Sequence, residues 1–143
     1  MNNKGGNSMG HIDWGNQFSV NVVELDEQHK KLFGMINELS DAIEAKRDRE
    51  FLEKTLSDLL GYTETHFNAE EGYLKKYGYL DYENHCMEHN ELRQDTIDLF
   101  LKYKHGEDVS PIKVMDFLKD WLRHHILKVD MGYGLFLKER GVT

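Results

Sequence analysis

The apolar residues of the chain fall into four stretches with the period of a helix. In the first, residues 25–43, the inward positions are spaced by 4, 3, 4, 3 and 4 residues. A similar rhythm runs through residues 52–77, which end before Gly78, and through residues 82–103, which end before Gly106. Positions three and four apart lie on one face of a helix, so each stretch predicts a helix packed in a bundle.

A fourth helix is predicted to begin at Ser110 and Pro111. A serine at the N-cap and a proline in the first turn are typical of a helix start. The pattern continues to about Arg140 and stops before Gly141, a residue type that favours the left-handed turn after a helix. Four helices with short connections predict an all-α fold, an antiparallel up-down-up-down four-helix bundle.

The segment before the first helix, residues 11–24, carries apolar residues in a largely alternating pattern: Trp14, Phe18, Val20 and Val22. It is too short to form a sheet alone, so it predicts an extended N-terminal arm lying on the bundle. Residues 1–10 are small and polar without a period and predict a loose tail. Since 143 residues suffice for a single core, residues 11–143 are expected to form one four-helix domain.

The composition excludes several classes of protein. The net charge is −8 and the basic residues are not clustered, so neither nucleic acid nor a membrane surface is expected as a partner. No apolar run approaches the roughly 20 residues that span a bilayer, and no signal peptide is apparent, so a cytoplasmic location is expected. The single cysteine, Cys86, cannot form an internal disulfide, so stability must come from packing or from a bound metal.

Six polar residues occupy positions where a bundle normally places leucine or isoleucine: His29, His66, Glu70, His85, His89 and His125. Burying such a group without a partner costs several kcal/mol against a total stability of about 5 to 15, so their burial must be compensated. Positions four apart project to one side of a helix, which pairs His66 with Glu70 and His85 with His89. Imidazole nitrogens together with carboxylate oxygens suit a first-row transition metal.

Asp130 is a further candidate ligand whose spacing is unusual. It follows His125 by five residues, which turns it about 140° away on an ideal helix. Either the helix is locally widened by a π-helical turn, or one side chain reaches round. The apolar pattern permits the wide turn, because the rhythm from Leu118 to Leu137 is kept with one residue inserted at this point.

The remaining polar residues are interpreted as surface groups. The three other helical or arm histidines are expected to face solvent or to cap helices: His11, His105 and His124. Three acidic residues are expected on solvated faces: Glu64, Glu71 and Asp81. Around His125, the apolar residues Trp121, Leu122 and Ile126 are compatible with ordinary core packing or with a dry wall beside the metal.

Four segments carry the candidate ligands: LDEQHKKLF around His29, HFNAEE from His66, HCMEH from His85, and HHILKVD ending at Asp130. With these segments the chain resembles the hemerythrin family, and within it the bacterial hemerythrins. The resemblance implies two non-haem iron ions with a bridging oxo or hydroxo group. One iron would take His85, His89 and His125, the other His29 and His66, and Glu70 and Asp130 would bridge them.

Ligand counting indicates what such a centre can do. Five histidines, two bridging carboxylates and a bridging oxygen fill all but one coordination position of two six-coordinate irons. The resemblance implies reversible dioxygen binding at that position, with Trp121, Leu122 and Ile126 lining the oxygen pocket, in a carrier or store and not an enzyme. The alternative is an oxygen or redox sensor module of a signalling protein. Besides dioxygen, the partner would be an oxygen-consuming enzyme or a signalling domain.

Overall fold

The computed structural model describes residues 11–106 and 110–143, and every regular element within them is a helix. The elements follow the order η1 (Asn16–Phe18), α1 (Val23–Glu44), α2 (Arg49–Lys76), α3 (Tyr82–Lys104), α4 (Pro111–His125), η2 (Ile126–Asp130) and α5 (Met131–Glu139). Here η1 is a 3₁₀ helix and η2 is a π-helical segment. The all-α prediction is confirmed, and the predicted loose tail, residues 1–10, lies outside the described residues.

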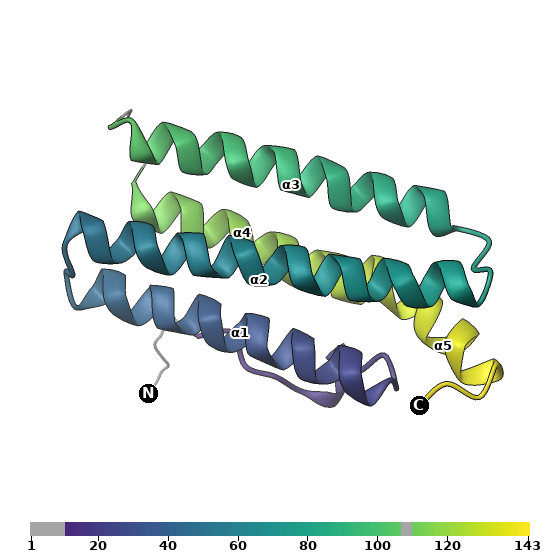
Figure 1. Cartoon of the computed structure of the whole chain (residues 1–143). Coiled ribbons are helices and arrows are strands. Elements are labelled where there is room, and N and C mark those ends of the chain that lie inside the picture. Colours follow the sequence, from purple (N-terminus) through teal and green to yellow (C-terminus); the bar gives the residue numbers. More distant parts are fainter. Residues whose placement is uncertain (1–10, 107–109) are drawn as a thin grey trace.

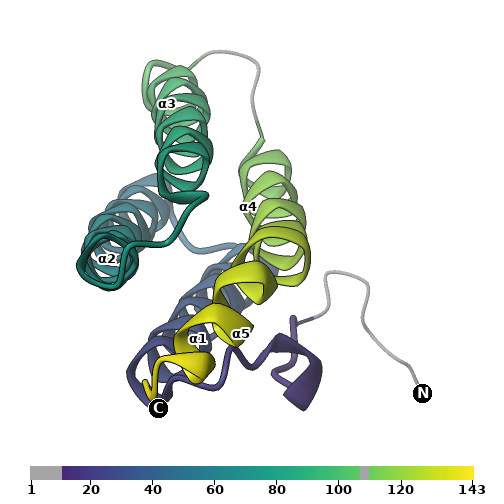
Figure 2. The same cartoon turned by 90° about the vertical axis from the view of Figure 1, so that its right-hand side faces the viewer.

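The four long helices, α1 to α4, lie side by side as a bundle (Figure 1). α1 packs against α2 and α4, and α3 packs against the same two helices, so the four close into the ring seen in Figure 2. Successive helices joined by short connections run in opposite directions, as predicted. Within the described residues, no helix is both long and apolar enough to cross a membrane.

The helix ends follow the predicted chemistry. The side chain of Ser110 accepts a hydrogen bond from the backbone N–H of Lys113, and Pro111 occupies the first turn of α4. Gly78 and Gly106 follow α2 and α3 with φ angles of 72° and 77°. Glycine adopts such left-handed angles without a steric penalty, so these two residues determine where the helices end.

The predicted fourth helix is interrupted at the segment with the unusual spacing. Instead of one helix to about Arg140, the chain forms α4, the π-helical segment η2 and then α5. Of the two arrangements that the sequence allowed, the structure has the wide turn. It brings Oδ1 of Asp130 to 3.0 Å from Nε2 of His125. A single extra residue in the turn therefore places both side chains on the same side.

Residues 11–22 lie along the bundle as the predicted arm, with η1 as a helical turn within it. Phe18 and Val20 are buried and Trp14 is half-buried. At Gly134 of α5, a Cβ atom would stand 2.9 Å from the carbonyl oxygen of Val20. Only the absence of a side chain at Gly134 lets the arm approach α5 this closely.

The apolar core is divided into two clusters along the bundle. The larger cluster includes Leu32 and Leu122, and the smaller cluster includes Leu25 and Leu74. His29 lies on α1 between Leu25 and Leu32, and it belongs to a buried polar layer between the two clusters. Apolar packing therefore separates this layer from water in both directions along the bundle.

Candidate metal centre

The structure brings all seven predicted ligand residues into that one buried layer. None of them has more than 2% of its surface exposed. α1 contributes one residue, α2 and α3 two each, and α4 and η2 one each: His29; His66 and Glu70; His85 and His89; His125; Asp130. The pairs on α2 and α3 share a face because they are four residues apart. Side chains from all four long helices thus converge on the centre of the bundle.

These side chains form two groups, in each of which the candidate ligand atoms lie within 4.8 Å of one another. The group that we call the three-histidine position consists of His85, His89, His125, Glu70 and Asp130. The group that we call the two-histidine position consists of His29, His66, Glu70 and Asp130. Both carboxylates belong to both groups, so each group could hold a cation and share the carboxylates with the other.

The carboxylate of Glu70 divides its two oxygens between the positions. Its Oε1 lies 3.1 Å from Nε2 of His89 and 3.4 Å from Nε2 of His85. Its Oε2 lies 3.0 Å from Nε2 of both His29 and His66. One oxygen therefore faces each group of imidazoles.

The carboxylate of Asp130, on the opposite side of the layer, also divides its two oxygens between the positions. Its Oδ1 lies 3.0 Å from Nε2 of His125 and 3.4 Å from Nε2 of His85. Its Oδ2 lies 3.2 Å from Nε2 of His29. Both acidic residues thus present one oxygen to each position, which is the arrangement that a bridging carboxylate requires.

The contacts fit shared coordination better than hydrogen bonding. Among the described residues, Nε2 of His89, Nε2 of His125 and both oxygens of Asp130 are buried without a hydrogen bond of suitable geometry. Because metal–ligand bonds are about 2.1 Å long, two ligands at right angles on one ion stand roughly 3.0 Å apart. The N···O separations across the layer are 3.0 to 3.4 Å. The donor set therefore fits transition-metal ions.

Burial and neighbouring charges set the protonation of the layer. Burial alone would raise the pKa of Glu70, but the imidazoles of His66 and His29 hold it well below its usual range. Burial disfavours the cationic form of His29, yet the close carboxylates of Asp130 and Glu70 outweigh it and raise its pKa from 6.5 to about 9. At His66 burial dominates and lowers the pKa. The layer thus holds anionic carboxylates that a cation would neutralise.

Three further residues contact the layer and are missing from the sequence prediction: Gln28, Glu71 and Tyr133. Nδ1 of His66 donates to Oε1 of Gln28 at 2.6 Å, and Nδ1 of His89 donates to Oε2 of Glu71 at 2.7 Å. Each bond leaves the Nε2 lone pair of its imidazole directed into the layer. The hydroxyl of Tyr133 donates to Oε2 of Glu70 at 2.6 Å. The prediction of a solvated Glu71 is wrong, because only 19% of its side chain is exposed.

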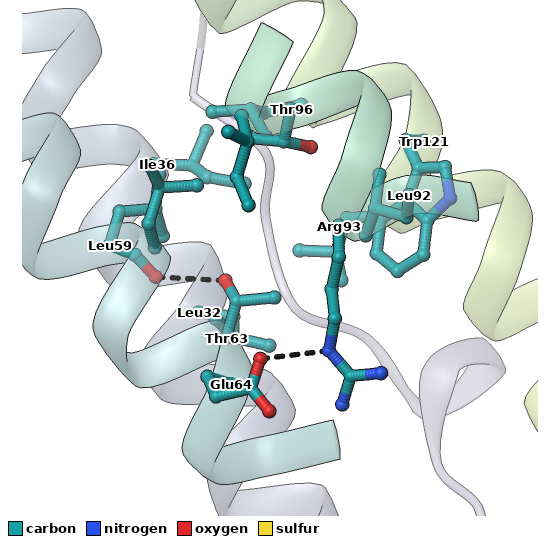
Figure 3. Close-up of a pocket in the computed structure, with 13 residues that line it drawn as sticks. Leu32, Ile36, Leu59, Thr63, Glu64, Leu92, Arg93, Thr96 and Trp121 are labelled. Carbon is teal, nitrogen blue, oxygen red and sulfur yellow. Dashed lines mark hydrogen bonds and ion pairs between the residues drawn. The ribbon is translucent and has the colours of Figure 1, made fainter. Parts of the chain in front are cut away.

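A largely apolar cavity of about 80 Å³ lies between the four long helices, about one helical turn from the layer (Figure 3). Leu32 and Thr63 line it, and each lies three residues from a histidine of the two-histidine position. Trp121 and Leu122 also line it, whereas Ile126 is buried in the larger apolar cluster and is not part of this lining. Two of the three predicted pocket residues, Trp121 and Leu122, therefore line the same cavity.

The other histidines lie apart from the layer. All three are exposed, as predicted: His11, His105 and His124. The single cysteine, Cys86, is half-buried. None of these residues belongs to the two groups of candidate ligands.

A four-helix bundle with a buried layer of histidines and shared carboxylates defines a class, the metal-binding helical bundles. The model of one family of this class, described as "Hemerythrin HHE cation binding domain", matches residues 20–134. The chain belongs to the hemerythrin family.

Individual relatives agree with this assignment. The chain is 39% identical over 118 residues to a bacteriohemerythrin of Methylococcus capsulatus, covering 82% of this chain and 89% of that protein. It is 35% identical to a hemerythrin-like protein of Naegleria gruberi, covering 85% and 90% of the two chains. A crystal structure of wild-type hemerythrin superposes with a TM-score of 0.81 at 38% identity, covering 86% of this chain and 95% of that one. The resemblance expected from the sequence is therefore confirmed.

Proposed function

We propose that the protein binds dioxygen reversibly, as a carrier or store, at a non-haem diiron centre in the buried layer. The observation that carries this proposal is that Glu70 and Asp130 each present one oxygen to each of the two groups of histidines. A single-metal site would not need carboxylates divided in this way. The family assignment supports iron as the metal.

The residues of the layer fall into ligand sets by their contacts. In the proposed centre, His85, His89 and His125 would hold one iron, His29 and His66 would hold the other, and Glu70 and Asp130 would be shared by both, with an oxo or hydroxo group completing the pair. When bound, the iron pair supplies the electrons and the open coordination position that dioxygen binding needs. The open coordination site would lie at the two-histidine position, because that position has one imidazole fewer.

The surrounding residues favour binding over turnover. Leu122 is 3% exposed, and Trp121 stacks on His125 with ring centroids 4.6 Å apart, so apolar groups shield this end of the layer from water. Tyr133 holds the shared carboxylate of Glu70 from the other cluster. Neutral imidazoles outnumber carboxylates five to two in the ligand set, and a donor set of low charge gives little support to strongly oxidised iron. A protein that binds oxygen and releases it unchanged is the role that these features support.

The test uses the full chain. Iron per chain is measured first, and the protein is then reduced without air and exposed to oxygen. Two irons per chain and a visible charge-transfer band that disappears again under argon are expected. A matched variant, Glu70→Ala, should lose the band and at least one iron. Zinc in place of iron, or the absence of any oxygen-dependent band, would refute the proposal, and steady consumption of oxygen would indicate an enzyme.

A further inference from the structure

The imidazole of His89 is fixed on its edge and on its face by neighbouring side chains. On the edge, Nδ1 donates to the carboxylate of Glu71 at 2.7 Å. On the face, the ring of Phe67 stacks at a centroid distance of 3.7 Å and an interplanar angle of 6°. His89 has no exposed side-chain surface, so this orientation is fully enclosed. A ligand of the three-histidine position is thus held in place before any metal binds.

Arg93 holds Glu71 in its place. Its Nη2 lies 3.5 Å from Oε2 of Glu71, and its Nε donates to Oε1 of Glu64 at 2.8 Å, the pair drawn in Figure 3. The guanidinium also lies over the ring of Phe67, 5.2 Å from its centroid. Glu71 thus accepts a hydrogen bond from His89 and is paired with the guanidinium of Arg93. The group behind His89 is therefore a carboxylate anion.

The two-histidine position has a different surrounding. The group behind His66 is the neutral amide of Gln28, at 2.6 Å. Nδ1 of His29 is buried without a hydrogen-bond partner among the described residues. No carboxylate outside the layer therefore contacts either imidazole of this position in the described structure, whereas the three-histidine position has Glu71 in contact and Glu88 at 3.9 Å from Nδ1 of His125.

This difference affects how strongly each position binds a cation. A carboxylate that accepts from Nδ1 makes Nε2 of the same ring a stronger donor and fixes its direction, whereas an amide fixes the direction with little effect on donor strength. Removal of such a group typically weakens metal binding about 10- to 100-fold. The three-histidine position also has one imidazole more than the other, which strengthens its metal binding further.

We propose that the two metal positions are unequal, and that Glu71 is the positioning residue that makes the three-histidine position the tighter of the two. The inference rests on the proposed two-metal centre. It predicts an order of loading, in which the three-histidine position fills first and the metal of the two-histidine position, which has the open coordination site, is the one that exchanges.

The test is a calorimetric titration of the metal-free 143-residue chain with Zn²⁺, which binds without redox chemistry. The unmodified protein should take up two zinc ions in two steps of different affinity. Glu71→Ala should weaken the tighter step about 10- to 100-fold and leave the other unchanged. Glu71→Gln, which keeps the volume and an acceptor oxygen, should recover part of this loss. Gln28→Ala should weaken only the looser step and so increase the difference in zinc affinity between the two steps.

Glu64→Gln serves as the matched control, because it breaks the other ion pair of Arg93 and leaves the bond between Glu71 and His89 intact. It should leave both steps within about 3-fold, well below the effect expected at Glu71. Unchanged zinc binding in both Glu71 variants, or a loss confined to the looser step, would overturn the inference. Uptake of a single zinc ion would overturn it together with the two-metal assignment. Two unequal zinc steps in a protein that fails to bind oxygen would overturn the proposed function alone.

Discussion

Replacement of Tyr133 by phenylalanine removes one buried hydrogen bond and little else. The hydroxyl donates to Oε2 of Glu70 at 2.6 Å, and both side chains have no exposed surface. The phenylalanine ring keeps the edge contact with His85, whose centroid is 5.5 Å away. Because the acceptor is a buried carboxylate, the loss should lower the free energy of unfolding by about 1.5–3 kcal/mol. For a chain of this length this corresponds to a fall in Tm of roughly 5–10 °C.

Tyr73→Phe is the matched control for this prediction. Tyr73 donates to Oε1 of Glu24 at 2.7 Å, so the same bond of nearly the same length is broken, but at an exposed site. Water replaces the lost partner there, and a change below about 0.5 kcal/mol is expected. Both variants are compared by urea unfolding in the presence of a chelator, so that metal binding to Glu70 does not mask the difference. Equal losses in the two variants would refute the reasoning from burial.

Other outcomes follow from the same structure. With a pKa of about 9, His29 is protonated at pH 7.5 and must lose that proton to bind metal, so zinc uptake should release protons and strengthen as the pH rises towards 9, as followed with a pH indicator. Leu122→Ala should open the apolar wall and speed the loss of reversible oxygen binding in air, and an unchanged rate would count against the wall. Gly134→Ala, whose Cβ would stand 2.9 Å from the Val20 carbonyl oxygen, should destabilise by about 1–3 kcal/mol. Gly72→Ala, in open space on α2, should instead stabilise by about 0.5–1 kcal/mol in urea unfolding.

The ligand residues could be predicted because helical geometry alone brings most of them together. His66 with Glu70 needs only the four-residue repeat, and the spacing of His125 and Asp130 restricted the local structure to two arrangements. Glu71 could not be predicted, because it lies about 100° round α2 from Glu70 and its contact depends on how α2 and α3 pack together. A single helix carries no information on that packing. Its acidic side chain therefore matched the pattern of a solvated face.

The partners of the last helix escaped prediction for a related reason. Tyr133 fits an apolar seam, and nothing in its spacing shows that its hydroxyl reaches Glu70. The contact depends on the rotation that η2 gives to α5. The close approach of Val20 to Gly134 depends on the same rotation and on the path of the arm. Such contacts need the relative placement of elements, which hydrophobic periodicity leaves open.

The π-helical turn makes this part of the chain sensitive to length. Deleting any one residue between His125 and Asp130 would restore the ordinary pitch and rotate everything beyond it by about 100°. This one deletion would break three sets of contacts: those of the Asp130 carboxylate, of the Tyr133 hydroxyl and of Gly134 with the arm. The number of residues in this segment is thus fixed by the contacts that lie beyond it.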